Sequence, residues 1–257
     1  MRTILIIGST GKLGKALVNH FKNENCIEAS RSLVRQNNQY HLDFADFQSI
    51  LDFIADFQSI SVDTLFVNSG IVCEKSFTKD GLDTMLMVNA FGPYYLVKEF
   101  LKTHPFCNII LTSSVSILRA KLDFSPKNYK EMYRNTKLLE HMLFRSLEEE
   151  TPKRNIFYAH PGIVYSKLSS RLHCRLIQKW IRHFGNSLNN AVSGIIAAEH
   201  LHQDCCWVCP SRFFQLKGKS KLRKIKKDLS LNPKTKEYIG KIEKELEEKY
   251  GISCVGL

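Results

Sequence analysis

The chain has 257 residues, of which 44% are hydrophobic, so it can bury the core of one full domain. No stretch approaches the roughly 20 consecutive apolar residues of a transmembrane helix, which argues against an integral membrane protein. Only Met1 and Arg2 precede the first apolar run, so we expect no signal peptide.

The N-terminal residues predict a strand, a glycine turn and a helix in succession. Residues 2–7 are a short β-branched run typical of a buried parallel strand, and residues 15–21 have helical spacing. Between them stands Gly8-Ser9-Thr10-Gly11-Lys12-Leu13-Gly14. Glycines let backbone approach a pyrophosphate, and a helix N-terminus offers unpaired N–H donors. We predict that this turn binds a dinucleotide; the alternative is a tight turn without a ligand.

The second strand, about residues 26–30, is followed by Arg31 and by no carboxylate. At this point of a dinucleotide fold an acidic residue holds the ribose hydroxyls, whereas an arginine accommodates a 2′-phosphate. Arg31 therefore favours NADP over NAD, although it could be a solvated loop cation. The third strand ends near Asp43 and Phe44, which places Asp43 to meet the adenine.

Two further strands end in polar residues. Residues 63–67 run into Asn68-Ser69-Gly70, and residues 108–112 run into Ser113-Ser114. Between these strands, residues 77–81 are expected to open a helix that carries Asn89. Ligands of open α/β sheets bind at the carboxyl ends of the strands, so these groups are candidates for contact with substrate and cofactor.

Tyr133 and Lys137 are spaced four residues apart in a predicted helix and so share one face. A phenol has an unperturbed pKa of about 10, and a neighbouring ammonium favours the phenolate. The pair could therefore exchange a proton with a substrate. On its own the spacing is common on solvated helix faces.

Taken together, residues 3–170 resemble the short-chain dehydrogenase/reductase family. The matching pieces are Gly8-x-x-Gly11-x-x-Gly14, Asp43, Asn68-Ser69-Gly70, Asn89, Ser113-Ser114, Tyr133-x-x-x-Lys137 and Pro161-Gly162. Within the family, residues 78–92, 133–138 and 160–164 look most like retinol-dehydrogenase-like members. The resemblance implies a Rossmann-type, doubly wound parallel α/β sheet in a single domain, acting as an NADP-preferring carbonyl reductase or alcohol dehydrogenase.

The resemblance also implies roles for individual residues. Tyr133 would be the general acid/base, Lys137 would lower its pKa and hold the nicotinamide ribose, and Asn89 would hold a proton-relaying water. Ser114 would polarise the carbonyl oxygen, with Ser113 as the fallback. Ser166 would bind the carboxamide, and Pro161, Gly162 and Val164 would complete the cofactor contacts.

The glycine spacing is one residue tighter than the family's commonest pattern, which leaves other function classes open. A nucleotide-sugar epimerase or dehydratase tolerates this spacing, although the chain leaves little room for a larger C-terminal substrate domain. A catalytically idle NADP-binding scaffold is the third possibility. The loop between Ser114 and Tyr133 is long and is expected to shape the substrate pocket.

We expect residues 1–215 to form the dinucleotide-binding domain with its substrate flap, and 216–257 a basic segment and a terminal helix. Leu168, Leu172, Leu176 and Trp180 repeat at helical spacing, which indicates core or dimer packing or an apolar substrate wall. The net charge of +12 is concentrated in residues 217–227, which we interpret as solvated, with weak contact to a membrane surface as the alternative.

The remaining expectations concern cysteines, partners and location. Eight cysteines without a dense pattern indicate reduced thiols in the cytoplasm, and Cys205-Cys206-x-x-Cys209 lacks the second ligand pair of a zinc site. Cys254 begins a poor C-a-a-X outline for prenylation. Besides a small-molecule substrate we expect a homodimer or tetramer and no nucleic acid or metal, with a peripheral membrane location as the alternative.

Overall fold

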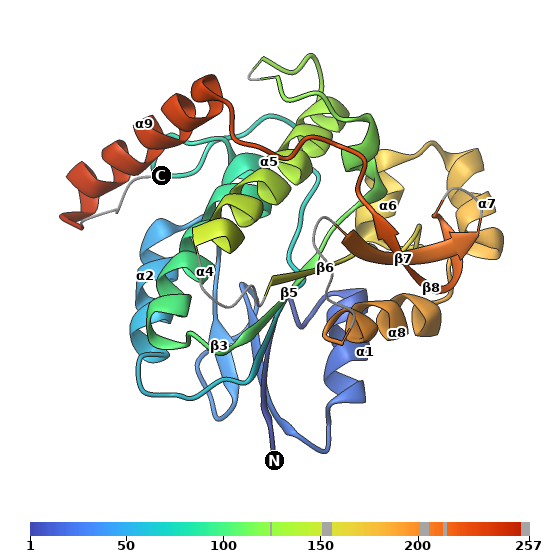
Figure 1. Cartoon of the computed structure of the whole chain (residues 1–257), viewed down its shortest axis with the longest axis horizontal. Coiled ribbons are helices and arrows are strands. Elements are labelled where there is room, and N and C mark those ends of the chain that lie inside the picture. Colours follow the sequence, from blue (N-terminus) through green and yellow to red (C-terminus); the bar gives the residue numbers. More distant parts are fainter. Residues whose placement is uncertain (124, 151–155, 201–205, 213–214, 253–257) are drawn as a thin grey trace.

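The computed structural model describes residues 1–123, 125–150, 156–200, 206–212 and 215–252. These residues build an eight-stranded sheet in the order β3-β2-β1-β4-β5-β6-β7-β8, with helices on both faces (Figure 1). Strands β1 to β7 run parallel, and β8 pairs antiparallel with β7. The expected fold class, a single-domain doubly wound parallel α/β sheet, is confirmed.

The strands are three to eight residues long. Their bounds are β1 (Thr3–Ile7), β2 (Asn25–Ser30), β3 (Gln39–His41), β4 (Thr64–Val67), β5 (Asn108–Thr112), β6 (Ile156–Ala159), β7 (Cys206–Arg212) and β8 (Lys217–Lys224). The central strands β1, β4 and β5 are buried on both faces, which explains why the sequence shows unbroken apolar runs there.

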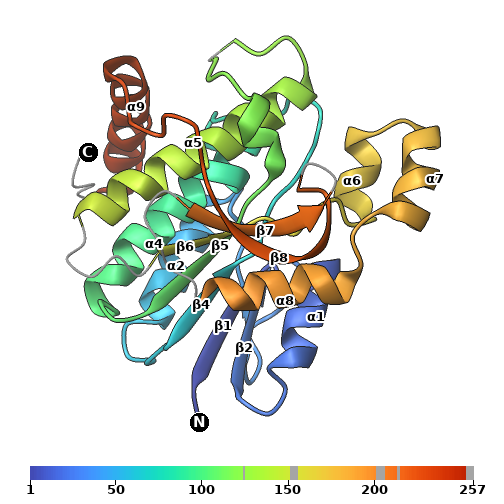
Figure 2. The same ribbon diagram turned by 45° about the vertical axis from the view of Figure 1, so that its right-hand side comes forward.

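Two helical layers enclose the sheet. Helices α1 (Lys12–His20) and α8 (Leu188–Ala198) cover one face, and α2 (Phe47–Asp56), α4 (Gly92–Thr103) and α5 (Tyr129–Glu150) cover the other. Short connecting turns are α3 (Thr84–Leu86), the π-helix η1 (Met87–Phe91) and the 3₁₀ helix η2 (Val115–Arg119). Helices α6 (Lys167–Leu172) and α7 (Arg175–Phe184) project together beside the end of β7 (Figure 2).

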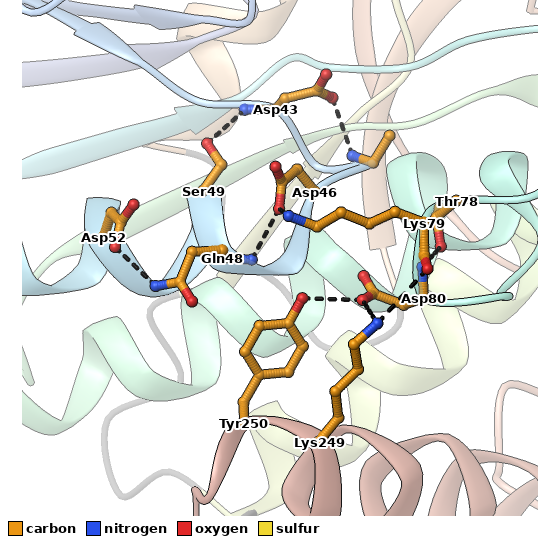
Figure 3. A network of polar contacts seen from close by, with 11 residues as sticks. Asp43, Asp46, Gln48, Ser49, Asp52, Thr78, Lys79, Asp80, Lys249 and Tyr250 are labelled. Atoms are coloured by element: carbon orange, nitrogen blue, oxygen red, sulfur yellow. Dashed lines mark hydrogen bonds and ion pairs between the residues drawn. The ribbon is translucent and has the colours of Figure 1, made fainter.

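The C-terminal part is more firmly joined to the domain than the sequence suggested. Residues 217–224, expected within a solvated basic segment, form β8, so the sheet continues across the expected boundary at 215/216. Helix α9 (Pro233–Tyr250) buries Ile239, Ile242 and Leu246 against the core on the α4 side. Figure 3 shows its last turn fixed to Asp80, whose Oδ1 lies 2.6 Å from Lys249 Nζ and accepts a 2.8 Å bond from the Tyr250 hydroxyl.

The helix expected to open at residues 77–81 begins later. Thr78 to Gly81 form a turn in which Gly81 has φ +80°. The Asp83 carboxylate then accepts a bond from Leu86 N at 3.0 Å and so provides the N-cap. The capping aspartate therefore sets the true start of the helix, because it pairs an N–H group that the first turn leaves free.

Candidate active site

The glycine turn lies at the carboxyl end of β1. Gly8 has φ +77°, and a Cβ on it would lie 2.9 Å from Asn68 O, so only glycine fits this close approach. A Cβ on Gly14 would lie 2.1 Å from Gly8 O, so Gly14 lets α1 pack directly on the turn. No side chain caps α1 at Gly11, which leaves the first N–H groups of the helix for a ligand. The turn thus fits a dinucleotide pyrophosphate.

Two cations meet a tyrosine beside this turn. Lys12 Nζ donates to Tyr165 O at 2.8 Å and lies 5.7 Å from the centre of the Tyr165 ring. From α7, Arg182 donates to the Tyr165 hydroxyl at 2.7 Å and lies 4.7 Å from the same ring. Lys12 belongs to the turn that the sequence predicts to bind a dinucleotide. The sequence did not indicate Arg182 as a residue beside that turn, because only the folded chain brings α7 to Tyr165.

The tip of β2 carries hydroxyl groups rather than a carboxylate. Thr10 Oγ1 donates to Ser30 Oγ at 3.2 Å, and Ser32 Oγ donates to Thr10 Oγ1 at 3.3 Å. Arg31 stands between the two serines and is exposed. Hydroxyl and guanidinium donors at this point suit an additional phosphate better than they suit ribose hydroxyls alone.

Asp43 and Phe44 follow β3, and they differ in what they can offer. The Asp43 carboxylate accepts a bond from Ala45 N at 2.9 Å and its backbone N–H bonds Ser49 Oγ at 3.0 Å, which fixes the turn into α2 (Figure 3). Phe44 is buried in the core, where its ring would meet a Cβ on Gly92 at 3.0 Å. Because this side chain is buried, a cofactor contact by Phe44 would fall to its backbone, and the contact stays a prediction.

Asn89 joins the segment after β4 to helix α5. Its Oδ1 accepts from Ile71 N at 2.8 Å, and its Nδ2 donates to Ile71 O at 2.9 Å and to Thr136 Oγ1 at 3.1 Å. It stands in the π-helix η1, a local widening that is frequent at functional sites. Next to Asn68, the hydroxyl of Ser69 is buried without a hydrogen-bonding partner, which is consistent with a polar ligand beside Gly70.

The two serines after β5 point to different partners. Ser113 Oγ is buried in a short contact with His141 Nε2. Ser114 begins η2, where its Oγ accepts from Ser116 N at 3.2 Å, and it lies close enough to the Tyr133 phenol to lower the pKa of that group. This arrangement favours Ser114 over Ser113 as the group that could touch a substrate oxygen.

Lys137 lies one turn beyond Tyr133 on α5 and is also directed at the end of β5. Its Nζ donates to Thr112 O at 3.0 Å and forms a close ion pair with Glu140, and both side chains are buried. Burial raises the pKa of the Glu140 carboxyl to about 7, more than the ammonium lowers it. Sequence reasoning missed Glu140, although its spacing of three from Lys137 places the two side chains on one face.

Tyr133 does not have the lowered pKa that the sequence predicted. Burial raises its pKa to about 12, the bond from Ser114 lowers it, and the charge of Glu140 raises it. The pKa of Tyr133 is raised because a buried phenolate loses its solvation by water. In addition, the negative charge of Glu140 offsets the positive charge of Lys137. The phenol is therefore firmly protonated at neutral pH.

Two histidines form a second buried group beneath the site. His141 stacks on Tyr158 with ring centres 4.7 Å apart, and His160 stacks on Trp207 at 5.3 Å. Burial lowers the pKa of His141 to about 3 and that of His160 to about 4, although a bond to Gln215 O raises the latter. Both rings are neutral in the folded protein at pH 7.

These histidines should make the fold sensitive to acid. Below about pH 6.5 these histidines take up protons in the unfolded chain but stay neutral in the folded protein. Their contribution to the free energy of unfolding is therefore fully present above that pH and is lost as the pH falls. His160→Phe keeps a ring on Trp207 but removes one titrating group. Between about pH 7.5 and 5, we expect wild type to lose about 2 kcal/mol more unfolding free energy than the variant. Urea unfolding at both pH values measures this, and an equal loss in both proteins would contradict it.

The segment after β6 lies beside the glycine turn. Gly162 has φ +80°, and a Cβ there would lie 2.6 Å from Leu216 O. Pro161 O accepts a bond from Asn186 Nδ2 at 2.7 Å, and Val164 is buried. The hydroxyl of Ser166 caps α6 by accepting from Ser169 N at 3.2 Å. These positions sit beside the glycine turn through the Lys12–Tyr165 contact, while a carboxamide contact by Ser166 stays a prediction.

The family model described as "NAD dependent epimerase/dehydratase family" matches residues 4–199. The chain belongs to this family. Together with the fold, the match places the chain in the short-chain dehydrogenase/reductase superfamily, whereas the retinol-dehydrogenase-like subtype stays a prediction. No curated protein matches the sequence.

Similar solved structures share the fold at low sequence identity. An uncharacterized protein from Mycobacterium paratuberculosis has a TM-score of 0.67 at 16% identity and covers 96% of this chain and 92% of its own. A short-chain dehydrogenase/reductase from Burkholderia multivorans with bound NADP has 0.52 at 20%, with 77% and 92% covered. The 3-alpha-hydroxysteroid dehydrogenase from Pseudomonas, complexed with NADH, has 0.57 at 16%, with 76% and 88% covered.

Among the described residues, no three His, Cys, Asp or Glu side chains gather as a metal site would require. Cys206 is half-buried and Cys209 buried, while Cys205 and Cys254 lie outside the described residues. The expectations about Cys205 and about prenylation of Cys254 are therefore untested.

Proposed function

We propose that this protein is an NADP(H)-dependent oxidoreductase that interconverts a carbonyl and an alcohol on a lipophilic substrate. One observation supports this most: Ser114, Tyr133 and Lys137 converge at the carboxyl end of β5. The parallel pairing of β1, β4 and β5 brings that end to the same edge of the sheet as the glycine turn. An acid, a hydrogen-bond donor and a cation thus share an edge with a dinucleotide cradle.

The chain's own residues would act on the substrate oxygen. The bound cofactor supplies the hydride to the carbonyl carbon. Ser114 donates a hydrogen bond to the carbonyl oxygen, and Tyr133 transfers its phenolic proton to that oxygen as negative charge develops. Lys137, released from Glu140, would hold the ribose and stabilise the tyrosinate that remains. Tyr133, which burial holds protonated, is in the state that a proton donor to the carbonyl oxygen requires.

An apolar cluster around Tyr133 supports a lipophilic substrate. Val72 and Met85 are buried against Tyr133, and Leu168 and Leu172 of α6 pack against them. Apolar walls with a few convergent polar groups are typical of sites for small organic molecules. The position of Leu168 and Leu172 beside Tyr133 therefore supports the proposal that they form an apolar wall for the substrate.

The NADP preference rests on the hydroxyls and Arg31 at the tip of β2. We expect Arg31→Asp to weaken NADPH binding by at least about tenfold, because a carboxylate repels the 2′-phosphate, while NADH binding changes little. Titration of cofactor fluorescence with both nucleotides measures the ratio. Arg35→Asp is the matched control, since Arg35 is already paired with Asp56 at 2.6 Å. Equal losses of NADPH and NADH in Arg31→Asp would refute the preference.

The second candidate is nucleotide-sugar epimerase or dehydratase chemistry, which the family match and the G-x-x-G-x-x-G spacing favour. Against it, β7 and β8 extend the main sheet and do not build a separate substrate lobe.

A panel of carbonyl compounds with NADPH separates the candidates. Net NADPH consumption supports the reductase, and conversion of a nucleotide sugar with recycled cofactor supports the epimerase or dehydratase. Tight cofactor binding without any turnover would instead support an idle scaffold and overturn the proposal.

A further inference from the structure

Helix α7 presents an apolar face that the described residues leave exposed. The exposed fractions are 79% for Leu176, 46% for Trp180 and 54% for Phe184, and Ile177 is exposed to a similar degree. Of the ten residues in α7 only Ile181 is buried. The helix is held along one edge, where Gln178 donates to Ser170 O at 2.7 Å and to His173 O at 2.8 Å. This exposure excludes packing of Leu176 and Trp180 in the core, whereas packing in a dimer stays untested.

The other side of α7 is basic. By the 3.6-residue period, the exposed Arg175 and Lys179 lie about 140° and about 100° around the helix from the centre of the Leu176–Trp180–Phe184 stripe. Residues 166–198, which span α6 to α8, contain no Asp or Glu. A helix with Trp, Leu and Phe on one side and Lys and Arg on the other is typical of helices that lie in the interface of a membrane.

The surroundings of α7 hold nearly all of the protein's excess charge. Residues 166–227 contain thirteen Lys or Arg and two Asp or Glu, against a net +12 for the whole chain. One of the two acids, Glu199, is buried and paired with Arg2 at 2.9 Å. On β8, Lys219, Lys221 and Arg223 are exposed on one side of the strand. The start of β8 is tied to the end of α7, because Gly218 N donates to Asn186 Oδ1 at 3.1 Å.

This charge decides between occupants of the apolar face. Two copies of the chain meeting through α7 would bring two strongly cationic surfaces together, which disfavours association. A bilayer containing anionic lipid instead offers both an apolar layer for Trp180 and counter-charges for the lysines. No described helix is long and apolar enough to cross a membrane. Figures 1 and 2 place α6 and α7 at the periphery of the molecule, where such a surface could reach them.

We propose that α7 is an interfacial anchor, which inserts its Leu176–Trp180–Phe184 stripe into the surface of anionic phospholipid bilayers while the basic residues around it contact the headgroups. This inference is independent of the catalytic proposal. It would add a hydrophobic anchor to the weak membrane contact that was the alternative to a solvated segment for residues 217–227.

Vesicle binding tests the anchor directly. The full chain is mixed with vesicles of phosphatidylcholine alone, or with about a quarter phosphatidylglycerol, and binding is measured by co-sedimentation. Trp180 gives an independent reading, because the chain has two tryptophans and the other, Trp207, is buried. We expect binding and a blue shift of tryptophan emission with the anionic vesicles, and at least tenfold weaker binding to the neutral ones.

Leu176→Ser/Phe184→Ser should weaken binding to anionic vesicles at least tenfold while Trp180 remains as reporter. Phe77→Ser, at an equally exposed phenylalanine outside α7, is the matched control and should bind like wild type. Equal binding of the double variant, or no binding of wild type, would overturn the proposal. So would light scattering that shows a dimer in wild type and a monomer in the double variant, because the stripe would then be a contact between copies.

Discussion

Tyr133→Phe is expected to lower the turnover of carbonyl substrates by about a thousandfold, within the range for loss of a general acid. The substitution removes only the hydroxyl oxygen, and the ring would keep its place beside Val72 and Met85. Binding of NADPH should stay within a few-fold of wild type, since the glycine turn is untouched.

The rate is measured as NADPH consumption with the best carbonyl substrate from the panel, and binding by cofactor fluorescence. Tyr238→Phe on α9 is the matched control and should retain the wild-type rate. If Tyr133→Phe keeps more than about a tenth of the rate, the acid/base assignment is wrong, because the hydroxyl would then supply far less than general acid catalysis does. Loss of cofactor binding along with turnover would instead indicate a structural role.

Much of the site was predictable because a parallel sheet brings its carboxyl ends to one edge. Gly8, Asn68 and Ser114 follow β1, β4 and β5, so their proximity follows from strand order alone. The fold class follows from the same pattern of buried strands alternating with helices. The side-chain partners inside the site could not be predicted from strand order. The pairing of Lys137 with Glu140, and the raised pKa of Tyr133, depend on burial and side-chain direction that no spacing rule supplies.

Two other differences came from signals present in the sequence but given too little weight. In residues 217–224, Lys217, Lys219 and Lys221 alternate with Gly218, Ser220 and Leu222, which is the two-residue period of a strand. The high charge of these residues instead favoured the interpretation as a solvated segment. For α7 the helical spacing was recognised, but periodicity reports only that one side is apolar. Whether another element covers that side depends on tertiary packing, and the structure leaves it open to solvent.

Gly14→Ala is expected to abolish cofactor binding and to destabilise the fold by about 3 kcal/mol, at the upper end for overpacking. The added methyl group would lie 2.1 Å from Gly8 O and 2.7 Å from Ser9 Cα, and both are backbone atoms that no side-chain rotation can move. Helix α1 must therefore shift away from the turn. The N–H groups that would face the pyrophosphate shift with it, so affinity for NADPH and NADH should fall together, unlike the selective loss expected for Arg31→Asp.

Gly240→Ala makes the comparison sharp, because it is the same substitution inside a helix with nothing within 4 Å of the new Cβ. There alanine should stabilise α9 by about 0.5–1 kcal/mol through its better helix propensity. Urea unfolding should therefore show a loss of stability for Gly14→Ala and a gain for Gly240→Ala. Cofactor titration should show a loss of binding for Gly14→Ala alone. If Gly14→Ala still binds NADPH within a few-fold of wild type, the glycine turn does not hold the cofactor. Tyr133 at the end of β5 would then have no source of hydride beside it, and the oxidoreductase proposal would fail.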